Sequence, residues 1–194
     1  MQLAGSAMSD SNEYILNLIK THVWSGFYDE DDVYRMIEDV LEEDADEALL
    51  RAAVLPEFQR KREAETSWPT TTDCDRLDDA FAELNADGII ALHNTGMTMS
   101  DGEGDVGQAL RERGRSRIRG FCFYHGQDVD SAVGGDGLWI AFGDVDAIAE
   151  QKRAVGQQIK ACLERHGLHV EWNGDPERRL SIPKLDWKRR RQSE

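Results

Sequence analysis

The stretch Arg119-Gly-Phe-Cys-Phe-Tyr124 decides the fold of this 194-residue chain, because it is a short apolar run that stops at His125-Gly-Gln-Asp128. Its length and its aromatic residues are typical of a buried strand. Two further runs, Ile89–Leu92 and Leu138–Phe142, are apolar on both faces, as central strands of a parallel sheet are. Leu168–Trp172 alternates apolar and polar residues, which predicts an edge strand.

Segments with helical spacing separate these runs. Apolar residues three and four positions apart predict helices over about 77–84, 106–112 and 148–163. Strands that alternate with helices favour crossover connections. We therefore expect an α/β fold with a small, mainly parallel or mixed, four-stranded sheet. The connection from Tyr124 to Leu138 is barely long enough for a crossover, so antiparallel pairing there is the main alternative.

The first third of the chain is helical and acidic. Ile15, Ile19 and Val23 recur at helical spacing, and Gly26 is expected to end that helix. Two more helices should follow, with a kink or restart at Pro56.

These patterns divide the chain into four segments. We expect a disordered lead-in or expression remnant at residues 1–8, an acidic helical segment at 9–65, a linker at 66–72 and an α/β domain at 73–194. The last segment ends in the basic run Lys188-Arg-Arg-Arg191. That run is expected to be a solvated tail or to fold back onto the acidic helices.

Charge and cysteine content limit the function classes. The formal net charge is −15, which disfavours nucleic acid and anionic membranes as partners. No apolar run reaches the roughly 20 residues of a membrane span. Cys74, Cys122 and Cys162 are far apart and odd in number, so we expect no disulfide framework or zinc knuckle. These features predict a cytoplasmic protein without membrane contact.

Polar residues follow the first two strands at the point where each should end. His93 and Asn94 follow the first, and His125, Gln127 and Asp128 follow the second. If these strands are parallel, their carboxyl ends share one rim, where ligands bind in such folds. We expect this rim to bind a small polar ligand or a peptide.

The same residues offer general acid–base chemistry. His125 is the candidate base, with Asp128 or Asp101 to orient it, and His93 or Asn94 would stabilise an oxyanion. Two histidines without ligand spacing do not indicate a metal, so we expect neither a metal nor another cofactor.

Gly102-Glu-Gly-Asp-Val-Gly107 is a literal G-x-G-x-x-G motif. The loop that separates it from the preceding strand is too long for a dinucleotide fingerprint. Glu103 and Asp105 would also repel a pyrophosphate. We expect a flexible loop here, either a lid over the rim or a mobile connection.

Several motifs together resemble an uncharacterised bacterial family that is classed as a domain of unknown function. They include Ile90-Ala-Leu-His-Asn94, Gly120-Phe-Cys-Phe-Tyr-His-Gly-Gln-Asp128 and Val170-Glu-Trp-Asn-Gly-Asp-Pro176. The resemblance covers most of the chain and implies a bacterial, cytoplasmic protein. It implies no activity, cofactor or catalytic residue.

The leading hypothesis is a non-enzymatic binding or regulatory protein that uses the polar rim, with the helical segment as a surface for a protein partner. A hydrolase-like enzyme with a His/Asp general acid–base site is the alternative. Replacing His93 and His125 by Ala tests the rim: a loss of more than about 2 kcal/mol of stability in both variants would make the histidines structural. Loss of a ligand-induced melting shift at unchanged stability would make them binding residues.

Overall fold

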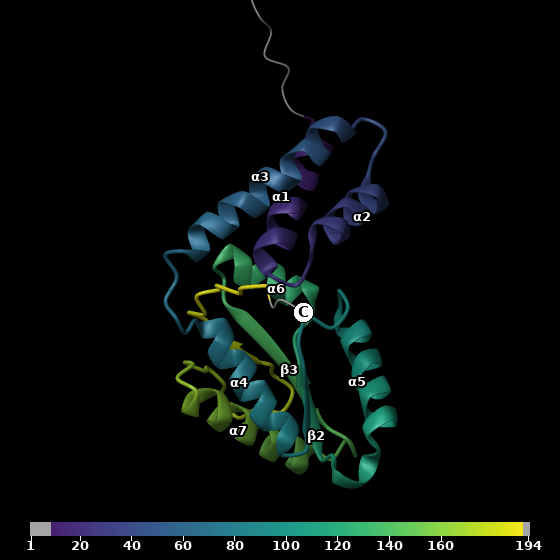
Figure 1. Cartoon of the computed structure of the whole chain (residues 1–194). Coiled ribbons are helices and arrows are strands. Elements are labelled where there is room, and N and C mark those ends of the chain that lie inside the picture. The colour runs from purple at the N-terminus through teal and green to yellow at the C-terminus, as the bar shows by residue number, and fades with distance from the viewer. Residues whose placement is uncertain (1–8, 192–194) are drawn as a thin grey trace, which may run out of the picture. The chain divides into compact units, whose positions relative to one another are not determined.

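The computed structural model describes residues 9–191 (Figure 1). The predicted lead-in, residues 1–8, lies outside this part of the chain. Two compact units divide the described residues: a helical unit of residues 9–68 with 189–191, and an α/β unit of residues 69–188. Within residues 9–191, no helix combines the length and apolarity needed to cross a bilayer.

The helical unit contains α1 (Asp10–Ser25), α2 (Glu30–Val40) and α3 (Glu47–Glu65). Each helix begins at a residue whose side chain accepts a backbone N–H of the first turn, which satisfies one of the donors that a helix start leaves free. These caps are Ser9, Asp29 and Asp46. Helix α3 continues through Pro56, so of the two expected outcomes, a kink or a restart, the restart is wrong.

The basic tail is part of the helical unit. The guanidinium of Arg189 lies 4.6 Å from the ring centroid of Phe27, and Arg191 Nη2 lies 3.3 Å from Asp29 Oδ2. Of the two expected arrangements, the tail adopts the one in which it folds back onto the acidic helices.

The α/β unit alternates helices and strands. Its elements are α4 (Asp73–Ala86), β1 (Ile89–Leu92), α5 (Met99–Arg113), the short 3-10 helix η1 (Arg115–Arg117), β2 (Gly120–Phe123), α6 (Gly126–Gly134), β3 (Leu138–Asp144), α7 (Ala149–Arg165) and β4 (Leu180–Ile182).

The four strands of residues 69–188 form a mixed sheet in the order β1-β2-β3-β4. Strands β1 and β2 are parallel, with Ile89 opposite Gly120, and α5 makes the crossover between them. The β2–β3 and β3–β4 pairs are antiparallel. The α/β class and the mixed sheet are thus confirmed. The sheet is not mainly parallel, because the short connection through α6 reverses the chain.

The predicted strand over Leu168–Trp172 is wrong. In that stretch Glu171 forms an isolated bridge to Ser181, and the fourth strand is Leu180–Ile182. This strand has three residues and lies between two prolines, Pro176 and Pro183, so it carries too little pattern for sequence reasoning to find.

Helices cover the two faces of the sheet differently. Helices α4 and α7 pack on one face, and α5 lies on the other (Figure 1). On the first face, a Cβ added to Gly120 would lie 2.7 Å from Val155 of α7. On the second face, Val106 of α5 packs with Phe123 and Ala141.

The G-x-G-x-x-G motif lies inside α5, so the predicted flexible loop is wrong. Thr98 and Asp101 form a capping box that starts the helix before the first glycine. Gly102 allows α5 to approach the sheet closely, since a Cβ there would lie 2.2 Å from the Phe123 ring.

Candidate functional site

The two candidate histidines lie at the same edge of the sheet but belong to opposite faces. Because β1 and β2 are parallel and in register, the carboxyl ends of both strands meet. His93 packs on the α4 face: its ring lies 4.4 Å from that of Phe81, and Nδ1 lies 2.8 Å from the Tyr124 hydroxyl. Asn94 follows with a φ of 47°, which turns the chain away from the strand.

His125 belongs to a different environment, at the start of α6. Its backbone N–H donates to Asp128 Oδ2 at 3.1 Å. Its ring Nδ1 lies 3.2 Å from the same oxygen, but it has no hydrogen-bond partner among residues 9–191. The residue is 4% exposed, whereas Gln127 is exposed in the first turn of α6. The structure therefore joins His125 to Asp128 but not to His93.

Asp128 connects the start of α6 to the segment that precedes β4. It is 3% exposed, and both of its carboxylate oxygens contact Arg179. Nη1 of Arg179 lies 2.8 Å from Oδ1 and 3.1 Å from Oδ2. A buried carboxylate needs such partners, because an unpaired one is strongly disfavoured. Asp128 thus holds the Arg179 side chain in place.

Asp101 caps α5. Its Oδ2 accepts hydrogen bonds from the Thr98 hydroxyl and from the backbone N–H groups of Thr98 and Met97. These bonds hold the pKa of Asp101 below its usual range, with a smaller contribution from the charge of His125. The geometry explains Asp101 as a helix cap rather than as an orienting group for a base.

A pocket of about 450 Å³ opens beside α5 over β2 and β3. Its floor is apolar, formed by side chains that the strand register places on one face of the sheet: Phe121, Phe123, Ala141 and Gly143. Met99 and Glu103 of α5 form one wall, and residues 176–179 form another. The Phe121 and Phe123 rings are stacked with centroids 6.3 Å apart.

The charged rim of this pocket is partly neutralised within the protein. Lys152 Nζ lies 3.1 Å from Glu177 Oε1, and Arg179 is paired with Asp128. Asp144 is 7% exposed, and its Oδ2 accepts the Ile148 N–H at 2.6 Å. Its Oδ1 has no hydrogen-bond partner in the part of the chain that the structure describes. We call this part of the pocket, where β3 ends at Asp144, the Asp144 corner; its Oδ1 can accept a further hydrogen bond.

The second half of β3, next to Asp144, is buried but lacks a strand partner on the β4 side within residues 9–191. In the described residues, β4 pairs with Leu138–Ile140 but not with the following residues. The backbone N–H and C=O of Ser181 both bond to Glu171, on the side of β4 away from β3. Because backbone groups alternate along a strand, those of Leu180 and Ile182 point toward β3. Leu138 and Ile140 of β3 therefore direct their backbone groups toward β4, and the same alternation directs those of Phe142 to that side, beyond the last paired residue.

The sequence motifs did not predict this pocket. It lies over the middle of the sheet, whereas the predicted rim lies at one end. The sequence pairs large with small residues here, Phe121 with Gly143 and Phe123 with Ala141, but only the fold shows that α5 covers the second pair and not the first.

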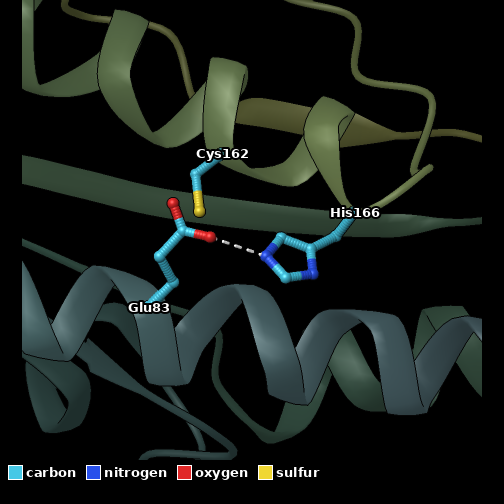
Figure 2. A group of neighbouring side chains, drawn as sticks. All are labelled: Glu83, Cys162 and His166. Atoms are coloured by element: carbon cyan, nitrogen blue, oxygen red, sulfur yellow. Dashed lines mark hydrogen bonds and ion pairs between the residues drawn. The ribbon is translucent and has the colours of Figure 1, made fainter.

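A separate cluster joins α4 to α7 (Figure 2). Glu83 of α4 points toward Cys162 of α7 and toward His166, the residue that caps the end of α7, and their ligand-type atoms all lie within 4.8 Å of one another. His166 Nε2 lies 2.8 Å from Glu83 Oε2, while Arg165 bonds Oε1. Hydrogen bonds from His166 and Arg165 hold the pKa of Glu83 below its ordinary value. Burial raises the pKa of Cys162 to about 11.

Sequence reasoning also missed this cluster. The retrievable signal was the four-residue spacing of Cys162 and His166, which puts both side chains on one face of a helix. Glu83 is about 80 residues earlier, so only the fold brings it near.

The chain belongs to a family described as Domain of unknown function (DUF6891), whose model matches residues 8–191. This match confirms the expected resemblance to a domain of unknown function over most of the chain. No curated protein matches the chain, and no solved structure matches it either.

Proposed function

We propose that this member of the DUF6891 family is a non-enzymatic binding protein that holds a small ligand in the pocket over β2 and β3. The observation that carries the proposal is the apolar floor of Phe121, Phe123, Ala141 and Gly143, which forms a hollow beside α5. Small-molecule sites are concave and mostly apolar, with a few polar groups that fix orientation. This pocket has an apolar floor, and charged side chains of α5, β3, α7 and residues 176–179 surround it.

The polar end of the ligand is inferred from Asp144. Two rim cations are already paired, Lys152 with Glu177 and Arg179 with Asp128, and an exposed pair such as Lys152–Glu177 contributes little. A buried acceptor without a partner is different, since supplying its hydrogen bond relieves a penalty. We infer a ligand with a flat apolar part and a cationic or N–H donor group directed to the Asp144 corner.

One residue of the predicted rim, Asp128, holds a side chain of the pocket wall in place. Asp128 holds Arg179, which lines the pocket wall, and His125 lies against Asp128. The hydrolase alternative is less well supported, because His125 is 4% exposed and His93 lies on the other face of the sheet. A general base must reach the proton that it removes, directly or through one water.

We further propose that the protein is bacterial and cytoplasmic and does not bind nucleic acid. The net charge of −15 opposes binding to phosphate backbones. The three cysteines are buried and form no disulfide in the described residues 9–191, which suits a reducing compartment.

Calorimetric titration of the purified full chain tests the ligand class. The probe is 2-phenylethylamine, and 3-phenylpropionate is an acid of similar size. We expect the amine to bind at one site and the acid to bind at least fivefold more weakly. Tighter binding of the acid, or no binding of either probe, would contradict the proposal.

Two variants connect binding to the Asp144 corner. Asp144→Asn keeps an acceptor for the Ile148 N–H but removes the charge, so amine affinity should fall roughly tenfold, about 1.4 kcal/mol. Asp146→Asn is the matched control, because Asp146 is exposed and paired with Arg115. Equal losses in both variants would assign the effect to net charge and overturn the role of Asp144.

A further inference from the structure

We propose that Glu83, Cys162 and His166 form a zinc-binding site between α4 and α7, with one coordination position open to solvent. The inference concerns a site separate from the ligand pocket and does not depend on it. The spacing of His93 and His125 predicted no metal, and the zinc site proposed here consists of other residues.

The three residue types are those that zinc selects. Thiolate sulfur, imidazole nitrogen and carboxylate oxygen are its ordinary protein ligands, and three protein ligands with one open position are common. A thiolate together with an imidazole favours zinc over magnesium or calcium, which prefer oxygen. Thiolate and carboxylate together also balance the charge of a divalent ion.

The geometry requires small movements. Tetrahedral zinc with bonds of about 2.0–2.3 Å places its ligands about 3.5 Å apart. Here His166 Nε2 and Glu83 Oε2 lie 2.8 Å apart, and all three ligand atoms lie within 4.8 Å of one another. Side-chain shifts of about 1 Å would therefore suffice. Cys162 and His166 come from successive turns of one helix, since the His166 N–H bonds the Cys162 carbonyl.

Arg165 has a defined place in this arrangement. It bonds Oε1 of Glu83, which leaves Oε2 directed at His166 and available to a metal. Hydrogen bonds to the second oxygen of a ligating carboxylate orient it, as outer-shell partners do in metal sites. Arg165 thus positions Glu83 rather than competing for the same oxygen.

The burial pattern indicates where the open position lies. Cys162 is fully buried at the inner end, and its Sγ donates to the Ala80 carbonyl at 3.5 Å. The Glu83 and His166 side chains are partly exposed at the outer end. When zinc binds, the Cys162 thiol loses its proton to solvent, and sulfur forms the bond to the metal. Water would fill the fourth position on the outer side.

Cobalt(II) is the probe, because a cobalt–thiolate bond gives an intense near-ultraviolet charge-transfer band and tetrahedral Co²⁺ gives strong visible bands. The purified full chain is treated with a chelator, dialysed and titrated with Co²⁺. We expect one equivalent to produce both bands and one equivalent of Zn²⁺ to abolish them. Absence of the charge-transfer band at saturating Co²⁺ would overturn the site.

Matched variants assign the ligands. Cys162→Ala should lose the charge-transfer band, while Cys74→Ala, another buried cysteine of the α/β unit, should keep it. Since Cys162→Ala risks unfolding, Glu83→Gln serves as a second variant at a partly exposed position. It keeps the side-chain shape and should weaken Co²⁺ binding at least tenfold. A band that persists in Cys162→Ala, or unchanged affinity in Glu83→Gln, would contradict the assignment.

Discussion

Arg179 and Asp128 are joined across 51 positions of the sequence: Nη1 of the arginine contacts both oxygens of a carboxylate that is 3% exposed. This pair ties the segment before β4 to the start of α6. It also connects the rim expected from the sequence to the pocket found in the structure, because Arg179 lines that pocket. The position of Arg179 in the pocket wall therefore depends on Asp128, which does not line the pocket.

Asp128→Asn should destabilise the α/β unit by about 2 kcal/mol, because the buried group loses a charge-assisted bond and part of the α6 cap. The cost stays near this value because the Arg179 side chain is 35% exposed, so water can hydrate its charge when the pair is lost. Chemical denaturation measures the change. Asp136→Asn, at an exposed position just after α6, is the charge-matched control and should shift stability by less than about 0.5 kcal/mol. Equal effects would show that the pair has no specific role.

Two of the three glycines of α5, Gly102 and Gly104, should respond in opposite directions. Gly102→Ala places a Cβ 2.2 Å from the Phe123 ring and should cost about 1–3 kcal/mol. Gly104→Ala meets nothing within 4 Å and should stabilise the protein by about 0.5–1 kcal/mol through helix propensity. Thermal or urea unfolding of both variants checks this. If alanine were tolerated equally at both positions, the close packing of α5 on β2 would be wrong.

The cap of α5 should be sensitive to acid. The pKa of Asp101 is lowered from 3.8, mainly by its bonds with Thr98, so the carboxylate stabilises the folded state at higher pH. That stabilisation is present above the unfolded pKa and is lost as pH falls through the lower folded value. The amide proton shifts of Met97 and Thr98 should therefore titrate with a midpoint below 3.8 in NMR spectra. A midpoint above 3.8 would contradict the hydrogen bonds that define this cap.

The cysteines should be inert in the folded protein. Cys74, Cys122 and Cys162 are buried, and burial raises the pKa of Cys122 well above its ordinary value and that of Cys162 to about 11. A chromogenic disulfide reagent at pH 8 should react with none of them until the chain unfolds. Addition of denaturant should then release three equivalents of product. Rapid reaction of any thiol in the native state would show that its helix or strand opens locally.

Much of the α/β fold was predictable because its strands are continuous apolar runs. The residues of β1, β2 and β3 were placed from such runs, and the helices from apolar spacing and caps. The fourth strand was not, since Leu180–Ile182 is short and its pairing partner on β3 is distant in sequence. Leu168–Trp172 has the alternation of a strand, but in the fold it contributes a single bridge.

The candidate site was harder to predict than the fold. Which residues follow each strand can be read from the chain, but the face on which a side chain lies depends on strand register. His93 and His125 illustrate this, because they share an edge and differ in face. The G-x-G-x-x-G stretch shows the same limit: glycine was taken as a sign of flexibility, whereas at Gly102 it permits close packing.

The central claim is that the pocket over β2 and β3 holds a ligand, and mapping a bound probe by NMR tests it most directly. We would titrate the isotopically labelled full chain with 2-phenylethylamine and follow the backbone amide shifts. The largest shifts should occur at Phe121, Phe142, Gly143 and Asp144, with little change at His93 and Asn94. Shifts centred on His93 and Asn94, or no shifts at saturating amine, would contradict the account.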